Sequence, residues 1–400
     1  MSEIDLIDKL QKIVLVLSMT PSEGGKFQYS LNMLFDLAQA KSPRYKISVI
    51  YFDKVWEKYL TNLDLPACYV EKIESIIYRV LRKLFLKVMH SVAMIRILSK
   101  FCSKIYKVIN DLQPDYVIYP GNDSFAYEFD FKSIIPIFDL MHRYEKFKEV
   151  CEHGEYKSRE FHYNYVAKYA AGVLVDSEIG YQQVLECYNI DEKKLLVYRY
   201  KPPYYVTHYQ SVDINKKYKL PKHYIFYPAQ FWSHKNHKII IEALKIINNS
   251  GHDLSAVFVG EKKNAFDEVQ MLIKEKEIED NIFVLGYVNN DDLVSLYKNA
   301  IALVFPSFFG PTNIPPLEAI ALDCPVLCAD VYAAREQLAD AAIYFNPRKT
   351  TELVDSLKLI LLNPEKSNDL RKRGRIRLSE ILLSEKGTDI EKVLSQLENI

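Results

Sequence analysis

Short apolar runs alternate with longer amphipathic segments along most of the chain. In the first half, six runs rich in Val, Ile, Leu and aromatic residues have the pattern of strands that are buried on both faces of a parallel sheet. These runs are 13–18, 47–52, 116–119, 134–138, 172–176 and 195–198. Helical stretches separate most of them, beginning with 27–40 after a turn at 23–25. The alternation predicts a doubly wound parallel sheet.

The pattern stops between residues 201 and 213, where Pro202 and Pro203 stand in a stretch without a clear period, and then it restarts. The strands expected in the second half are 224–227, 256–259, 281–285, 302–305, 325–329 and 342–345, with a helix at 238–248. We therefore expect an α/β protein of two Rossmann-like domains, 1–205 and 206–385, with a ligand cleft between them. A C-terminal helix at 386–400 is expected to pack back toward the first domain.

The amino-acid composition indicates which binding partners and which cellular compartment to expect for this protein. The 52 Lys and Arg balance the 52 Asp and Glu, so no overall field attracts nucleic acid, and we expect no nucleic-acid partner. The six cysteines are scattered without a CxxC pair, and Glu3, Asp5 and Asp8 precede the first apolar run, the reverse of a secretory signal. These features predict a cytoplasmic protein. Since there is neither a His/Cys cluster nor a paired-Asp motif, we expect no metal and no cofactor.

One stretch is strongly asymmetric in charge. Residues 75–109 contain no acidic residue, while Arg and Lys alternate there with large apolar residues. Such a pattern is typical of a basic amphipathic segment that makes peripheral contact with an anionic membrane. It is equally typical of ordinary helices whose apolar stripe packs on a sheet. The sequence leaves both interpretations open.

Two strand-loop-helix turns of the second half carry candidate chemistry. The segment 305–318 enters a helix opened by Pro315 and Pro316, and a helix N-terminus offers unpaired N–H groups to a diphosphate. Glu318, one turn later, could accept hydrogen bonds from ribose hydroxyls. In the segment 227–237, Lys235 could neutralise a leaving phosphate as a compact charge. Taken alone, the first turn could also be an ordinary connection with a surface glutamate.

An ordered series of motifs supports the first interpretation. It comprises FVGE at 258–261, VLGYV at 284–288, PPLEA at 315–319, DCPV at 323–326 and, in the first half, PSEGGKFQ at 21–28, FDLMHR at 138–143 and VLVDSE at 173–178. The series resembles the retaining, GT-B-fold glycosyltransferases of glycosyl transferases group 1, which include bacterial mannosyl-, glucosyl- and rhamnosyltransferases of surface-polysaccharide assembly. The resemblance implies two Rossmann-like domains around a nucleotide-sugar site.

The resemblance also implies roles for individual residues. Gly24 and Gly25 would let the first loop approach the donor phosphates, which Lys235 would bind. Glu318 would hold the ribose, and Tyr287 and Val288 would lie near the base. The other donor-binding residues that it implies are Gln230, Gly260, Thr312, Asn313 and Ile314. Catalytic roles are implied for Lys235, Glu318, Asp139 and His142.

Three positions depart from the family pattern. Gly310 stands where the family has the first Glu of a Glu-x7-Glu motif, so the carboxylate that contacts the donor sugar is missing. Gln230 replaces a phosphate-binding Arg. Phe138 replaces the His of a His-Asp pair, and His142, four residues later, is assigned the polar role instead.

The function expected from this resemblance is transfer of a sugar, with retained configuration and without a metal, from a nucleotide-sugar donor to a glycan or lipid-linked acceptor. The process would be O-antigen or capsule biosynthesis. Two alternatives remain, a sugar-nucleotide epimerase or hydrolase of the same fold and a non-catalytic sugar-nucleotide-binding subunit. The second is motivated by Gly310 and Gln230.

Overall fold

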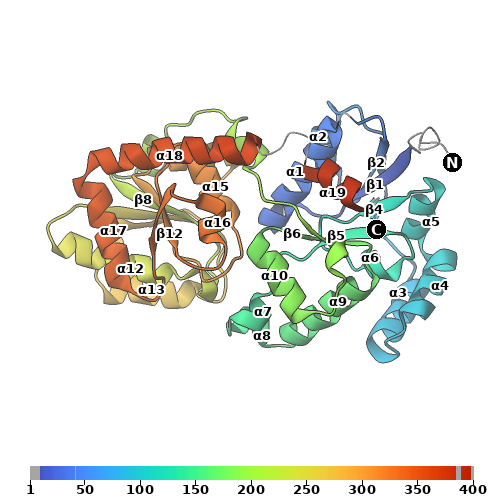
Figure 1. Cartoon of the computed structure of the whole chain (residues 1–400). Coiled ribbons are helices and arrows are strands. Elements are labelled where there is room, and N and C mark those ends of the chain that lie inside the picture. Colours follow the sequence, from blue (N-terminus) through green and yellow to red (C-terminus); the bar gives the residue numbers. More distant parts are fainter. Residues whose placement is uncertain (1–9, 41, 384–388, 398–400) are drawn as a thin grey trace.

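The chain forms two α/β domains that lie side by side, each built on a parallel sheet (Figure 1). The computed structural model describes residues 10–40, 42–383 and 389–397. The acidic residues Glu3, Asp5 and Asp8 and the ends of the predicted C-terminal segment, 386–388 and 398–400, lie outside the described residues.

The N-terminal domain contains a seven-stranded sheet. In spatial order its strands are β3 (Ala67–Tyr69), β2 (Tyr45–Tyr51), β1 (Gln11–Leu17), β4 (Tyr116–Ile118), β5 (Ser133–Pro136), β6 (Gly172–Val175) and β7 (Leu195–Val197). Alternate residues of β1 enter two separate cores, because Leu15 and Leu17 pack on one face of the sheet and Val14 and Val16 on the other. Burial of both faces explains why these strands appear in the sequence as continuous apolar runs.

Helices cover both faces of this sheet (Figure 1). They are α1 (Gly25–Gln39), α2 (Glu57–Leu60), α3 (Ile76–Lys83), α4 (Val92–Cys102), α5 (Lys104–Asp111), α6 (Phe125–Glu128), α7 (Met141–Tyr144), α8 (Lys148–Cys151), α9 (Glu155–Tyr169) and α10 (Glu178–Cys187). A π-helical turn, η3 (Leu84–Val88), continues α3.

The C-terminal domain repeats the architecture with six strands. Their spatial order is β10 (Ile282–Val284), β9 (Ser255–Val259), β8 (Tyr224–Pro228), β11 (Ala302–Phe305), β12 (Val326–Ala329) and β13 (Ala342–Phe345). Both sheets therefore have the doubly wound order 3-2-1-4-5-6, to which the N-terminal sheet adds a seventh strand at its edge, and ligands of such sheets bind at the carboxyl ends of the strands where the order reverses. In these sheets that point lies between β1 and β4 and between β8 and β11.

The helices of this domain are α11 (Ile214–Tyr218), α12 (His237–Asn249), α13 (Phe266–Glu275), α14 (Asn290–Asn299), α15 (Ile314–Ala321), α16 (Ala334–Leu338), α17 (Thr350–Leu362) and α18 (Pro364–Leu383). All twelve strands expected from the sequence are confirmed within one or two residues at their ends. Strand β3 was not predicted, because its three residues are exposed and show no apolar pattern.

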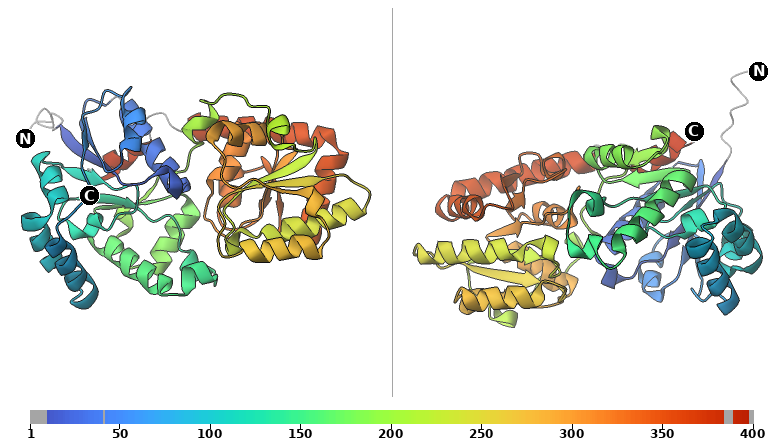
Figure 2. Two further views of the ribbon diagram at one scale, coloured as in Figure 1. Left: turned by 180° about the vertical axis from the view of Figure 1, so that it is seen from behind. Right: turned by 90° about the horizontal axis from the view of Figure 1, so that it is seen from below.

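The chain passes between the domains at both ends of the C-terminal domain. The first crossing follows β7 and leads into a short helical turn, η5 (Tyr204–Val206), whose Tyr205 and Val206 belong to the C-terminal core. After α18, helix α19 (Asp389–Leu397) lies against α1, so the first and last described elements, β1 and α19, are both in the N-terminal domain (Figure 2). Ile390, Val393 and Leu394 of α19 are buried in its core.

Direct contacts join the two domains on one side of the cleft. Phe308 and Phe309 of the C-terminal domain pack with Met141 and Val150 of the N-terminal domain in a small apolar core. Nearby, the Thr312 backbone N–H donates to the buried Asp176 carboxylate at 2.9 Å. These contacts hold the two strand-end edges facing each other.

Candidate functional site

Two cavities lie between the domains, and they share part of their walls. The first has a volume of about 410 Å³ and the second about 580 Å³. Gly25, Gln230, Ile314 and Pro315 line both, so the cavities meet where the loops after β1, β8 and β11 come together. This is the place that the strand order predicts for a ligand.

The N-termini of α1 and α15 converge at this junction. Gly25 is the first residue of α1 and Ile314 the first of α15, and a Cβ built on Gly25 would lie 3.5 Å from Ile314 Cδ1. The preceding residue, Gly24, has φ 56° and ψ −116°, a conformation that side chains strongly disfavour. Two helix N-termini that point to one place form a binding site for an anionic group.

The amides at the start of α15 are fewer than the sequence suggested. The Asn313 N–H already donates to Gln337 Oε1 at 3.1 Å, and Pro315 and Pro316 have no N–H to offer. Only the Ile314 N–H of this turn is left without a partner in the part of the chain that the structure describes. Thr312 lines the second cavity, but its N–H and hydroxyl both donate to Asp176.

Lys235 lines the second cavity, at the end of a helical turn, η6 (Ser233–Lys235), that follows β8. Its ammonium lies 5.6 Å from the centroid of the Phe305 ring. Among the described residues no carboxylate forms an ion pair with it. Burial lowers the pKa of Lys235 to about 8, and the negative charge of Asp139 partly opposes this. Lys235 is therefore a poorly solvated cation ready to receive negative charge.

Asp139 lies on the N-terminal side of the second cavity. Its Oδ1 accepts hydrogen bonds from Arg159, at 2.7 Å, and from the Met141 N–H, at 3.0 Å. Burial opposes its ionisation, but the Arg159 guanidinium, the Met141 N–H and His142 together outweigh that effect and hold the pKa of Asp139 below its usual range. The Oδ2 atom has no hydrogen-bond partner among the described residues, so this carboxylate can still accept from a ligand.

Gly310 lines the same cavity as Asp139. A Cβ at this position would lie only 3.2 Å from Tyr332 Cβ, closer than usual packing. Tyr332 is held by its hydroxyl, which donates to Glu145 of the N-terminal domain at 2.7 Å. Tyr332 therefore occupies the space next to Gly310 into which the side chain of a glutamate at this position would have to extend.

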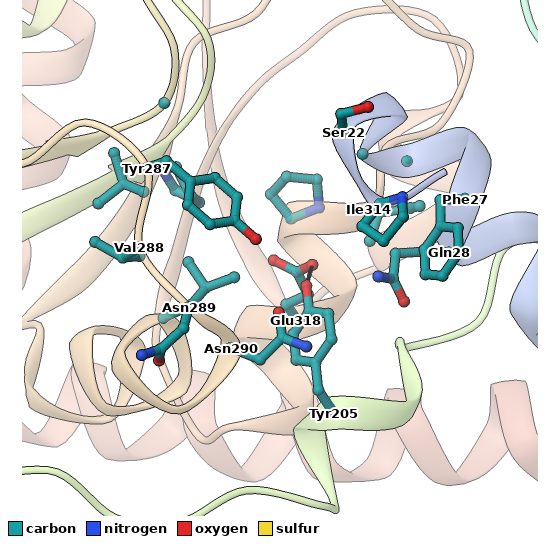
Figure 3. Close-up of a pocket in the computed structure, with 18 of the residues that line it drawn as sticks. Ser22, Phe27, Gln28, Tyr205, Tyr287, Val288, Asn289, Asn290, Ile314 and Glu318 are labelled. Carbon is teal, nitrogen blue, oxygen red and sulfur yellow. Dashed lines mark hydrogen bonds between the residues drawn. The ribbon is translucent and has the colours of Figure 1, made fainter. Parts of the chain in front are cut away.

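Glu318 lies in the first cavity, one turn into α15 (Figure 3). Its Oε1 accepts from the hydroxyl of Tyr205, and its Oε2 accepts from that of Tyr297 at 2.5 Å. Burial raises the pKa of Glu318, and the two hydroxyls counteract the rise. The tyrosines fix the orientation of the carboxylate, and each of its oxygens still has a second lone pair for a ligand.

An aromatic side chain also lines the first cavity. Tyr287 is 74% exposed, and the hydroxyl end of its ring points toward Glu318 (Figure 3). Gly260 also lines this cavity, and a Cβ there would lie 2.3 Å from the Ala229 carbonyl oxygen, so only glycine permits the loops after β8 and β9 to approach so closely. Val288 and Gln230 complete this wall.

His142 lies apart from these groups and is not among the residues that line either cavity. It is 2% exposed, and its Nε2 lies 2.7 Å from Glu160, which also binds Arg143 and Tyr188. Burial lowers its pKa. The structure thus places Asp139 in the cavity and His142 in a network behind it.

Several residues of the site were not predicted from the sequence. Tyr205 and Tyr297 orient Glu318, and Lys26 brings a further cation to the second cavity, beside Lys235 and Arg159. Glu149, from α8, accepts from His234 Nδ1 at 2.6 Å and links the domains beside Lys235. Of these, only Lys26 carried a signal, since it follows Gly24-Gly25 directly in a motif already assigned to the phosphates.

Comparison with known protein families identifies the family that the C-terminal domain matches. Residues 211–377 match the family described as glycosyl transferases group 1. The C-terminal domain belongs to that family. The matched residues contain Lys235, Gly310, Ile314 and Glu318, so this glycosyltransferase domain supplies the C-terminal wall of both cavities.

Curated relatives agree with this family. The chain is 28% identical over 193 residues to the O-antigen chain mannosyltransferase RfbU of Salmonella typhimurium, covering 48% of this chain and 52% of that protein. It is 26% identical over 140 residues to the O-antigen chain mannosyltransferase B of Escherichia coli, covering 34% and 37%. The chain thus spans about half the length of the first relative and less of the second.

Solved structures extend the likeness to the whole fold. The crystal structure of HepE from Anabaena in complex with UDP superposes with a TM-score of 0.66 at 14% identity, over 97% of this chain and 98% of that one. The two-domain architecture around the glycosyltransferase domain is the GT-B fold.

Proposed function

We propose that this protein is a retaining glycosyltransferase that transfers a sugar from a nucleotide-sugar donor to a glycan or lipid-linked acceptor in the assembly of a bacterial surface polysaccharide, such as O-antigen or capsule. One observation carries the proposal: two helix N-termini meet where two cavities join, with Tyr287 and Glu318 lining the first cavity and Lys235 and Asp139 lining the second. The names of the O-antigen relatives support the polysaccharide assignment.

The first cavity suits the nucleoside. Tyr287 offers an exposed ring on which a base can stack, and the oriented Glu318 carboxylate can accept hydrogen bonds from two ribose hydroxyls. The diphosphate would then lie at the junction, beside Gly25 and Ile314. That a structural neighbour was crystallised with UDP supports a nucleotide as part of the ligand.

The main chemical task is to stabilise negative charge as the sugar–phosphate bond breaks. The leaving diphosphate gains charge in the transition state, and preorganised positive groups lower its energy. Lys235 and the N-termini of α1 and α15 are placed for this task. Lys26 would supply the positive charge that is missing because Gln230 stands in place of the family's arginine. We propose that these groups, rather than a metal ion, offset the charge.

The second cavity would hold the donor sugar and the acceptor. Asp139 Oδ2 is a carboxylate oxygen without a hydrogen-bond partner among the described residues, and Asp139 lines this cavity together with Gly310. We assign it to a hydroxyl of the transferred sugar, as a replacement for the carboxylate missing at Gly310. An oxocarbenium-like sugar would be stabilised by the same negative charge, with attack by the acceptor on the face that the diphosphate leaves.

We further propose that transfer takes place in the cytoplasm. Cys68, Cys102, Cys151, Cys187, Cys324 and Cys328 all carry free thiols. Free thiols, exposed ones included, are typical of a reducing compartment.

A binding screen tests the donor site. A ligand that binds only the folded state stabilises it by about 2.7 kcal/mol at a hundred times its Kd, which thermal unfolding detects. We expect a nucleotide sugar to raise the Tm of the wild type and of the exposed control Glu268→Gln. In Glu318→Gln the nucleotide sugar should raise the Tm much less, because glutamine has the shape of glutamate but not its negative charge.

A release assay separates transfer from the alternatives. With a nucleotide sugar that binds, transfer predicts that free nucleotide appears only with a lipid-linked oligosaccharide fraction and that the sugar enters that fraction. Equal release without acceptor would identify a hydrolase instead, and an isomerised donor without release would identify an epimerase. Binding without any turnover would identify a non-catalytic subunit.

A further inference from the structure

The outer face of α3, η3 and α4 exposes large apolar side chains. Ile76, Ile77 and Val80 of α3 are 75%, 71% and 59% exposed, and Val88 at the end of η3 is 69% exposed. On the neighbouring α4, Ile97 and Phe101 are 59% and 73% exposed. We call this surface, over α3, η3 and α4, the apolar face. It lies on the side of the N-terminal domain away from the C-terminal domain (Figure 1).

These helices already have a complete buried side. Tyr78 of α3 is 1% exposed, and its hydroxyl lies 2.9 Å from the buried Ser99 hydroxyl of α4. On α4, Val92, Ile95 and Ser99 occur at spacings of three and four and face the core. The exposed apolar residues are therefore a second stripe that the packing of the domain does not use.

Unpaired cations lie on α3 and on α5, a helix that contacts α4. Residues 75–109 contain no Asp or Glu. Arg79, Lys83, Lys104 and Lys107 are exposed and have no ion-pair partner among the described residues. Arg82 differs, because it forms a bidentate pair with the fully buried Glu128 and so belongs to the structure of the domain.

We propose that the apolar face docks this protein peripherally onto an anionic lipid bilayer. Apolar side chains would enter the headgroup boundary while the unpaired cations bind anionic lipids. A second copy of the chain fits this surface poorly, because a two-fold contact would bring the same cations together. Within the described ranges, no helix has both the length and the apolar character needed to cross a bilayer. The inference is independent of the proposed transfer reaction.

Vesicle flotation tests the docking. The wild type should float with vesicles of phosphatidylglycerol and phosphatidylcholine, and much less with phosphatidylcholine alone. Arg79→Gln with Lys83→Gln should weaken binding to the anionic vesicles about thirtyfold, since each cation near the surface contributes about 1 kcal/mol. Ile77→Ser, Val80→Ser, Ile97→Ser and Phe101→Ser together should weaken it more than tenfold.

Matched controls on the C-terminal domain keep the test specific. Ile246→Ser, Met271→Ser and Leu362→Ser replace exposed apolar residues there, and Lys274→Gln with Lys372→Gln removes exposed charges. Both control variants should float like the wild type, and circular dichroism should show that all variants fold. Absence of wild-type flotation, or equal flotation of the apolar-face variants, would overturn the proposal. A wild-type dimer in sedimentation equilibrium that the apolar-face variants lose would assign the surface to a second copy instead.

Discussion

Lys235 is the residue on which the proposed chemistry depends most. It lies in the turn that follows β8, where the fold itself does not need a charged side chain. Burial lowers the pKa of its ammonium group, so the group loses its proton more easily. A cation that is poorly solvated before the ligand arrives gains more from a diphosphate than a solvated one. Its titration should therefore be visible in the kinetics.

The first prediction concerns pH. Because the pKa of Lys235 is about 8, its charge in the free protein is lost as the pH rises through that value, and kcat/KM for the donor should fall above about pH 8. Lys235→Arg keeps its charge at every accessible pH, so its profile should be flat there, at lower activity. Lys235→Ala should lower kcat by about a hundredfold to a thousandfold.

Steady-state rates across the pH range check this. The control is Lys274→Gln, which removes an exposed cation far from both cavities and should retain the wild-type profile. The same decline in Lys235→Arg would mean that another group titrates, and the role of Lys235 would have to be withdrawn.

Single residues show where sequence reasoning succeeded and where it stopped. The motif positions Lys235 and Glu318 do line the cleft, because a strand end and a helix start fix their place locally. Tyr205, which orients Glu318, stands 113 residues away in the sequence, in the turn that follows two prolines. No local pattern marks such a partner, since the contact is made only when the turn after β7 packs into the core of the C-terminal domain.

At the scale of elements, the helix starts rather than the helix bodies determine the site. α1 and α15 meet through Gly25 and Ile314, and Gly24 sets the angle at which the loop after β1 enters α1. The apolar pattern predicted the strands well because they are buried on both faces. It could not predict that the Asn313 amide is taken by Gln337, because that bond depends on where α16 packs.

The second prediction compares two adjacent glycines. Gly24→Ala should strain the backbone by about 1–3 kcal/mol, lower the free energy of unfolding accordingly and weaken donor binding, because Gly24 has φ 56° and ψ −116°. Gly25→Ala adds a Cβ that lies 3.5 Å from Ile314 Cδ1, an ordinary contact, so its stability should change little.

Urea unfolding and a donor titration of both variants check the comparison. Gly25→Ala is the matched control, with the same chemical change one residue away. Equal destabilisation of the two variants would show that the turn tolerates a side chain at Gly24 and that the entry angle of α1 is not fixed there.

At the scale of the whole molecule, the two sheets were predictable as two successive patterns, but their placement was not. Contacts such as Phe309 with Val150 and Thr312 with Asp176 join residues from the two halves. The helix α19 is a second such case, because an amphipathic pattern shows only that one face is buried and not which domain buries it.

The third prediction follows from α19. Leu394→Ala removes a buried side chain from the core shared with α1 and should lower the free energy of unfolding by about 2–5 kcal/mol. Hydrogen exchange should show the loss in α1 and β1 rather than in the C-terminal domain that precedes α19 in the sequence. Gln396→Ala, on the exposed side of the same helix, should leave exchange unchanged. Faster exchange confined to α17 and α18 would contradict this assignment.

The return of α19 to the first domain also has a consequence for biosynthesis. A ribosome releases the N-terminal sheet and its helices long before α19, so the apolar surface of α1 that receives Ile390, Val393 and Leu394 stays open while the whole C-terminal domain is being made. Domains usually fold as units as they emerge. Here the first domain can complete its core only after α19 (Asp389–Leu397) has been synthesised, which makes a nascent chain stalled before residue 389 a ready substrate for chaperones.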